Sequence, residues 1–283
     1  MHFSNVLLAA AGIIGASAHP SGHAHLHRSA HADKRGFYKA AHSKVTVPAT
    51  TTTTVAAAST SAAVASPAAT SSSSAVKKDF CAGLSKRATA ADIASTGNTG
   101  VEGHWGCNMM TVDESIASEY SYTTKFTNVD SEEYQVVCFN KIGPTGQIDG
   151  FWHAGLTFTV AAGASQDVAF DSNTQGGCAF GPGEVPKTSW GEYAGTWIEF
   201  DFGSERNNYW SGADCSSLVA ASESGQPIYG CNLCTEDKST CSTIYPGGAG
   251  VNSFIAGTAA LDGLGLNLPA GDVHLTVEIG HAA

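Results

Sequence analysis

The sequence predicts a mainly β protein, a disulfide-stapled antiparallel β-sandwich with few short helices. Three observations support this prediction. Short segments alternate apolar and polar residues, turn motifs rich in glycine and proline separate them, and all eight cysteines lie at or after residue 81. Strands with one apolar face are buried best between two layered sheets, and secreted domains are commonly cross-linked by disulfides.

Residues 1–18 have the features of a cleaved signal peptide. An apolar run from Val6 to Ile14 is followed by small residues that end at Ala18 in an A-x-A cleavage site. The run is too short to span a bilayer, and no later stretch is long and apolar enough. The sequence therefore predicts a protein secreted to the extracellular region or retained by contacts with the cell wall, with no membrane partner.

Residues 19–35 are predicted to be a His-rich propeptide removed at the dibasic pair Lys34-Arg35. The same segment allows an alternative. Cleavage after Ala18 would make His19 the N-terminal residue, and an N-terminal histidine can bind copper, as in secreted copper oxidases of polysaccharides. Because four more histidines lie in this short segment, its His-rich composition alone explains a histidine at position 19. The propeptide is therefore the favoured interpretation.

Residues 36–87 are predicted to be a disordered, O-glycosylated linker. From Thr46 to Ala75, 15 of 30 residues are Ser or Thr, and the rest are mainly Ala and Val. Such a segment has no aromatic residue to bury and cannot offset its ordering entropy. The linker ends in a second dibasic pair, Lys86-Arg87. Cleavage there would remove Cys81 or leave it attached only through a disulfide.

Residues 88–283 are predicted to form one β domain with its own core. From Ala88 to the end the chain has five Lys and Arg against 23 Asp and Glu, a formal charge of −18. A domain this acidic repels phosphate backbones and anionic lipid, which excludes nucleic acid as a partner. Neutral glycans and cationic surfaces remain open.

The eight cysteines are predicted to form structural disulfides. In an oxidising compartment an even set implies a framework of bridges, and eight cysteines allow 105 pairings that spacing does not distinguish. The pair Cys231-x-x-Cys234 resembles half of a zinc or redox motif, but no second CxxC completes it. No metal and no cofactor is expected. The set comprises Cys81, Cys107, Cys138, Cys178, Cys215, Cys231, Cys234 and Cys241.

Local patterns predict individual elements in chain order. Residues 113–120 and 253–261 are compatible with short helices. Leu156 to Val160 and Val273 to Ile279 alternate apolar and polar side chains, as half-buried strands do. Gly143 to Gly146, Gly181 to Gly183, Pro246 to Gly248 and Pro269 to Gly271 are turn motifs.

The segment from Gly195 to Gly203 is the candidate site. As a strand it places Ile198, Phe200 and Phe202 on the core face and Trp197, Glu199 and Asp201 on the opposite face, which is expected to point away from the core. An indole beside two carboxylates suits stacking on a sugar ring and accepting hydrogen bonds from hydroxyl groups. The flanking Trp210 and Asp214 are further glycan-binding candidates.

Two alternatives accompany this site. Side chains two apart on a strand start roughly 7 Å apart, so Glu199 and Asp201 could also span the separations of about 5 to 9.5 Å that glycosidases use. A solvated strand face on an acidic protein is the simpler explanation, and catalytic residues remain unassigned. The histidines pair with no Ser or Cys nucleophile, so a hydrolase triad has no support.

Four sequence strings stand out together: Asn140 to Pro144, Val168 to Gly176, Thr196 to Phe202 and Trp210 to Asp214. Through these strings the chain resembles the Asp f 4 allergen family of secreted fungal proteins. The resemblance implies an extracellular protein that binds human IgE and has no established enzymatic activity or cofactor. A weaker analogy, of architecture only, connects the chain with thaumatin-like proteins.

Together these observations predict a secreted, allergen-like fungal protein with IgE as a partner through the resemblance. A non-catalytic association with fungal wall polysaccharide is the expected native role. The alternative is a carbohydrate-active enzyme, either a carboxylate glycoside hydrolase or an N-terminal-histidine copper oxidase.

Overall fold

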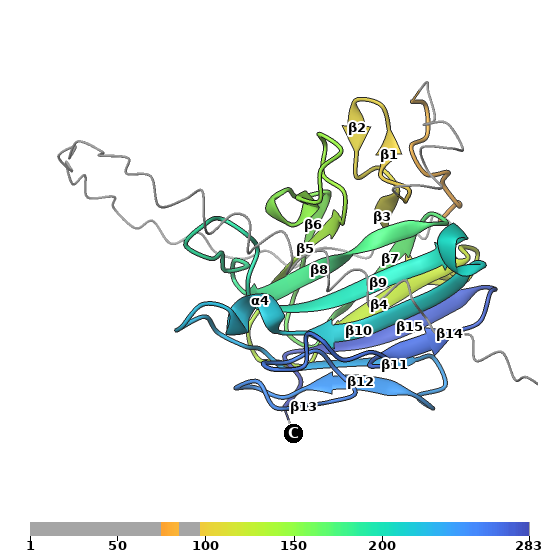
Figure 1. Cartoon of the computed structure of the whole chain (residues 1–283). Helices are drawn as coiled ribbons and strands as arrows, with labels where there is room; N and C mark the ends of the chain where they lie inside the picture. The colour runs from red at the N-terminus through yellow and green to blue at the C-terminus, as the bar shows by residue number, and fades with distance from the viewer. Residues whose placement is uncertain (1–74, 85–96, 283) are drawn as a thin grey trace, which may run out of the picture.

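The computed structural model describes residues 75–84 and 97–282 and confirms a mainly β fold with disulfides (Figure 1). The predicted signal peptide 1–18 and propeptide 19–35 lie outside the described residues, as do Ala18, Lys34, Arg35, Lys86 and Arg87. Within the described part, no helix has the length and apolar character of a membrane span.

A six-stranded antiparallel sheet forms one layer of the sandwich. All neighbouring strands pair antiparallel, with a β-bulge between Trp210 and Gly212 in β10, and β9 lies between β8 and β10. From edge to edge its strands are β14 (Leu266–Leu268), β10 (Trp210–Ser216), β9 (Thr196–Ser204), β8 (Thr174–Pro182), β5 (Tyr134–Asn140) and β6 (Leu156–Val160).

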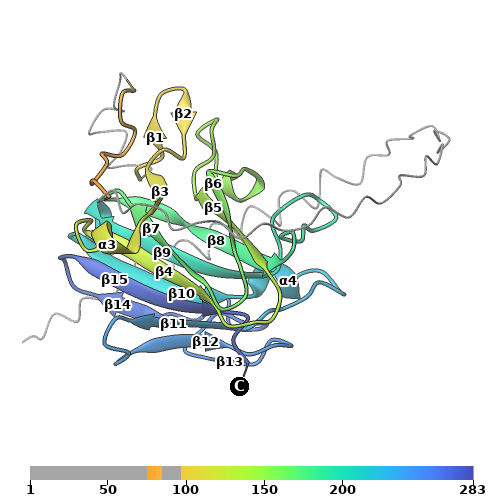
Figure 2. The ribbon, with the colours of Figure 1, turned by 180° about the vertical axis from the view of Figure 1, so that it is seen from behind.

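A seven-stranded sheet forms the other layer, as the view from behind shows (Figure 2). All its pairs are antiparallel except β15 with β4, which run parallel. Its strands in order are β13 (Gly250–Val251), β12 (Cys241–Ile244), β11 (Cys231–Thr235), β15 (Val273–Ile279), β4 (Tyr122–Asn128), β7 (Ser165–Phe170) and β3 (Met109–Val112).

The remaining elements are short. Asp113 caps α3 by accepting a hydrogen bond from the Ser115 amide at 2.9 Å, which confirms a helix at the start of the predicted segment 113–120. The other predicted helix, 253–261, is absent and turns take its place. The short elements are the β1–β2 hairpin (Gly100–Val101, His104–Trp105), α3 (Glu114–Ala117), α4 (Leu218–Ala221), and the 3-10 turns η1 (Gly150–Trp152) and η2 (Glu205–Asn207).

Aromatic side chains from both sheets fill the core. Phe170 on β7 lies 4.6 Å from Phe200 and 4.9 Å from Phe202 on β9, measured between ring centroids. Together with Ile198, these β9 residues are fully buried, as the alternation of the strand predicts. The strands at 156–160 and 273–279 are also confirmed, and β15 alternates buried and partly exposed residues along its whole length.

All eight cysteines are paired. Cys215 on β10 bonds to Cys231 on β11 and thereby joins the two sheets, whereas Cys138–Cys178 and Cys234–Cys241 link paired strands within one sheet. The fourth bridge, Cys81–Cys107, connects the segment 75–84 to the loop after β2. The two cysteines of the CxxC motif therefore belong to different disulfides, and the structural interpretation is confirmed.

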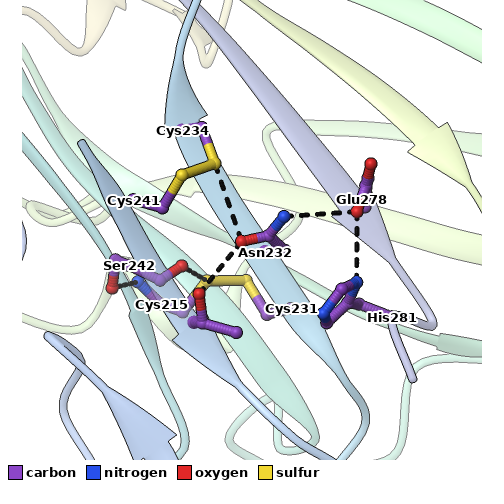
Figure 3. A network of polar contacts seen from close by, with 9 residues as sticks. Cys215, Cys231, Asn232, Cys234, Cys241, Ser242, Glu278 and His281 are labelled. Atoms are coloured by element: carbon purple, nitrogen blue, oxygen red, sulfur yellow. Dashed lines mark hydrogen bonds and ion pairs between the residues drawn. A yellow bond between two sulfur atoms is a disulfide. The ribbon is translucent and has the colours of Figure 1, made fainter. Parts of the chain in front are cut away.

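Hydrogen bonds reinforce the region around two of these bridges (Figure 3). The Ser242 hydroxyl accepts from the Cys215 amide at 2.9 Å. On the neighbouring strands, Asn232 donates to Glu278 at 3.2 Å, and the same carboxylate oxygen lies 3.1 Å from His281 Nδ1. Side chains of β11 and β15 are thus tied together beside the bridges that link β11 to β10 and β12.

We expect no titratable thiol in the native protein. Because every cysteine is bridged, a thiol reagent added to the unreduced, denatured protein should find no free group. The same assay after reduction should find eight, which serves as the positive control. Two or more free thiols before reduction would contradict the four-bridge framework.

Candidate functional site

The candidate site lies on the outer face of the six-stranded sheet, which points away from the sandwich core. Glu199 on β9 stands directly opposite Asp214 on β10, and Asp201 stands opposite Gly212. The structure therefore brings three predicted residues together, and we call Glu199, Asp201 and Asp214 the acidic row. Directly opposed side chains on paired strands have Cβ atoms about 4.5 to 5.5 Å apart, so Glu199 and Asp214 start from neighbouring positions on the sheet.

The acidic row is not an exposed strand face. Glu199 and Asp201 are each 5% exposed and Asp214 is fully buried. The expectation that this side of β9 is accessible is wrong, because the whole strand is buried on both faces. Alternation along a strand identifies the two faces but does not tell whether the outer one meets water or another layer.

Trp197 is buried as well and forms part of a second apolar cluster. Its ring makes an edge-to-face contact with Phe139 at 4.8 Å and lies 6.1 Å from Phe151, and its indole nitrogen donates to the Ala194 carbonyl at 3.3 Å. With 6% of its surface exposed, Trp197 cannot offer its face to a sugar ring. Its predicted role in stacking is therefore incompatible with its packing.

Two loops supply the cover over this part of the sheet. The loop from 141 to 155 contributes Phe151, and the loop from 183 to 195 contributes Val185, Tyr193 and Ala194. They pack on outward-facing side chains of β5, β8 and β9. The packing is also tight around Phe139 on β5. A Cβ added at Gly177, which stands opposite Glu199, would come within 3.1 Å of the Phe139 ring, so this glycine leaves room for the ring.

Hydrogen bonds hold the loops in place. The indole of Trp105 donates to the Ile142 carbonyl at 2.8 Å, and that of Trp152 donates to the Trp190 carbonyl at 3.2 Å. Trp190 in turn donates to the buried carboxylate of Glu192 at 2.8 Å. Glu192 is a buried acid that the sequence analysis missed, since it lies in a loop with no periodic pattern.

Glu223, which follows α4 in the chain, holds the loop from 183 to 195 through its carboxyl group. Hydrogen bonds from Ser189 and Gln226 lower the pKa of its carboxyl group. An acid that is ionised throughout the neutral range accepts such bonds more strongly.

Trp210 lies apart from the acidic row. It pairs with Ser204 at the start of β10, beyond a β-bulge that separates it from Gly212. The adjoining Tyr209 is 54% exposed and, like Asn208, has a left-handed backbone with φ of 62° and 51° respectively. Two consecutive residues other than glycine in this region are unusual, and Tyr209 is the exposed aromatic nearest to this end of β10.

The described residues offer no metal centre, because no three His, Cys, Asp or Glu side chains among them come together as ligands. His19, on which the copper alternative depends, lies outside the described part of the chain. The acidic row can accept hydrogen bonds from hydroxyl groups. Its Glu199–Asp214 pair also has the residue types of a glycosidase, so the geometry bears on both hypotheses.

Comparisons with known proteins identify relatives of this domain. Residues 107–279 match the model of the Allergen Asp f 4-like domain. The curated protein Allergen Asp f 4 of Aspergillus fumigatus is 34% identical over 196 residues, which cover 68% of this chain and 60% of that protein. The chain thus spans about 60% of the length of its curated relative.

Among solved structures, the protein elicitor MoHrip2 from Magnaporthe oryzae aligns with 56% of this chain and 99% of its own. The identity is 11% and the TM-score is 0.34.

Proposed function

The chain belongs to the family of Allergen Asp f 4-like domains, and on that premise we propose that it is a secreted antigen that binds IgE and associates, without catalysis, with neutral cell-wall polysaccharide. The observation that carries the second part is the pair of aromatic residues at the start of β10, where Tyr209 is 54% exposed and Trp210 is partly exposed. The four disulfides agree with secretion.

An exposed aromatic side chain favours a sugar ligand because the apolar face of a sugar ring can stack on it. Asn208 and Tyr209 also hold left-handed backbone conformations, and strained residues of this kind cluster at binding sites. The acidity of the domain disfavours anionic partners, which leaves neutral polysaccharide as the favoured ligand.

The IgE proposal is tested with sera from patients sensitised to the Aspergillus relative. We propose that IgE binds the native domain and that binding falls after reduction and alkylation, because epitopes assembled from separate strands depend on the four bridges. Equal absence of binding to both forms would remove this part of the proposal.

We predict that Tyr209→Ala and Trp210→Ala each weaken retention on insoluble β-glucan or chitin about 5- to 100-fold. Each variant removes an aromatic ring that can stack on a sugar, and aromatic stacking in other ligand grooves is worth about 1–3 kcal/mol. The measurement is a depletion isotherm with each polymer. Glu236→Gln, an exposed acid in the turn between β11 and β12, is the matched control and should bind like the wild type.

Unchanged retention in both variants, or no retention of the wild type on any wall polymer, would refute polysaccharide binding at this end of β10. The direct opposition of Glu199 and Asp214 keeps one catalytic alternative. Release of new reducing ends by the wild type that Glu199→Gln abolishes would establish a glycoside hydrolase in place of a binding protein.

A further inference from the structure

A cavity of about 340 Å³ lies between the sandwich and the segment 75–84, which is drawn in orange in Figure 1. Three stretches of chain line it: residues 77–80, residues 120–122 leading into β4, and residues 170–172 at the end of β7. Its volume falls at the lower end of the range of about 300–1,000 Å³ for small-molecule sites. Neither the acidic row nor Tyr209 and Trp210 are part of this lining, so the cavity is a separate site.

The outer wall of the cavity is held on the sandwich by Tyr120. The Tyr120 hydroxyl accepts from the Lys78 amide at 2.8 Å and donates to the Lys78 carbonyl at 3.0 Å. Phe80 meets the same ring edge-on at 5.7 Å between centroids. The Cys81–Cys107 disulfide adds a covalent anchor one residue further on. The wall therefore stays in place without help from a ligand, and the cavity is preformed.

The inner wall carries a tyrosine hydroxyl that the protein leaves without a partner. The ring of Tyr122 is part of the core, 5.6 Å from that of Phe202, and 8% of the residue is exposed. Among the described residues, none forms a hydrogen bond with its hydroxyl. That oxygen is not sealed, in contrast to the hydroxyl of Thr124 on the same strand. Because Tyr122 lines the cavity, an incoming ligand can supply the missing bond.

The backbone makes room for this hydroxyl. A Cβ at Gly203 would collide with the Tyr122 oxygen and come within 3.1 Å of the Ser172 hydroxyl. Gly203 also has a φ of 56°, which residues other than glycine rarely adopt. The hydroxyl groups of Tyr122 and Ser172 therefore lie over the same glycine, and each of them can both donate and accept.

The charges around the cavity balance. The Lys77 ammonium lies over the Tyr120 ring, and Asp171 accepts a hydrogen bond from an asparagine side chain at 2.9 Å. The remaining charged residues of the lining, Lys78 and Asp79, are exposed neighbours of opposite sign. A ligand with a net charge would be attracted by one of them and repelled by the other. A neutral ligand fits this arrangement better than an ion.

We propose that this cavity binds a neutral sugar unit, which is either a free saccharide or the end of a wall polysaccharide. The ligand's hydroxyl groups bond with those of Tyr122 and Ser172, since hydroxyl groups on both sides donate and accept. The half-buried ring of Phe80 offers apolar surface to one face of the sugar ring. The proposal does not depend on retention of polymers by Tyr209 and Trp210.

The test is a titration of the isotope-labelled full-length protein, followed through the NMR signals of its backbone amides. The probes are glucose, N-acetylglucosamine and their β-linked disaccharides, with glucuronate and glucosamine as charged comparisons. Neutral sugars should shift the signals of residues 78–80, 121–122 and 172 together. No shift of these signals with any neutral sugar, or a stronger response to a charged one, would overturn the proposal.

Two variants test the hydroxyl pair. Tyr122→Phe should weaken binding of the neutral sugar about 2- to 10-fold, the equivalent of one neutral hydrogen bond. It should unfold at the same denaturant concentration as the wild type, and a lower midpoint would show that the hydroxyl serves the fold and not a ligand. Ser172→Ala, at an exposed position, should weaken binding by a similar factor.

Tyr245→Phe is the matched control for these variants. Its hydroxyl also has no hydrogen-bond partner among the described residues, and it lies outside the cavity. The control should bind the sugar like the wild type. Wild-type affinity in both Tyr122→Phe and Ser172→Ala would refute a sugar site at this hydroxyl pair.

Competition distinguishes the two sources of the sugar. If the free sugar releases the protein from an insoluble polymer, the cavity holds the end of a polysaccharide chain. If the sugar binds and retention on the polymer is unchanged, a free saccharide is the ligand. Retention on a polymer without any sugar-induced shift around the cavity would refute this site alone and leave the proposed function intact.

Discussion

Trp197→Ala is expected to lower the free energy of unfolding by about 3–5 kcal/mol, the range for replacing a buried tryptophan or phenylalanine with alanine. The indole fills the space between the sheet and the covering loops, where it contacts Phe139 and Phe151 and donates to Ala194. Its removal leaves a cavity and an unpaired carbonyl. The measurement is equilibrium unfolding in guanidinium chloride with the disulfides intact.

The control for this variant is Tyr209→Ala, since Tyr209 is the exposed aromatic at the other end of the strand pair. Its effect on the free energy of unfolding should stay within about 0.5 kcal/mol, as for most surface substitutions. If Trp197→Ala unfolds like the wild type but loses retention on glucan, the indole is a ligand contact and the packing described for it is wrong.

The double variant Cys215→Ala with Cys231→Ala is expected to cost about 2–5 kcal/mol. This bridge is buried and joins β10 of one sheet to β11 of the other. Its loss raises the conformational entropy of the unfolded chain and leaves a gap between the two sheets of the folded protein. The result is read from denaturant unfolding, and a shift in midpoint at constant slope identifies a change of stability.

Its control is Cys234→Ala with Cys241→Ala, a bridge between paired strands that spans 7 residues instead of 16. The loop-closure model predicts a smaller loss, by about 0.7 kcal/mol. A larger loss from the short bridge would show that local packing around β11 and β12, and not closure of the chain between the sheets, determines the effect.

The sequence predicted the strands well because their alternation is a local property. Ile198, Phe200 and Phe202 are in the core as the period of two requires. The burial of the outer face could not be predicted from this alternation, since it depends on loops from elsewhere in the chain that contact β9. The sequence of these loops does contain one indication that they are buried. Phe151, Val185 and Tyr193 make the loops more apolar than solvent-exposed turns need to be.

Local chemistry also explains the helix that does not form at 253–261. The Thr258 hydroxyl accepts from the Ile255 amide at 2.8 Å and donates to its carbonyl at 2.9 Å, replacing helical hydrogen bonds with a turn. Gly257 has a φ of 86°, which ends a right-handed helix. The disulfide pairing, in contrast, was beyond any local pattern, because three bridges join cysteines on strands that pair or pack only in the completed sheets, and the fourth connects the segment 75–84 to the loop after β2.

The parallel pairing of β15 with β4 has a consequence for how the protein is made. β15, the last strand of the described chain, lies between β4 and β11 in the interior of its sheet. During synthesis the strands up to β14 therefore leave the ribosome with the centre of one layer missing, and the two halves of that layer join only when residues 273–279 arrive. Such long-range pairing slows folding, and until it forms β4 and β11 each present an unpaired strand edge.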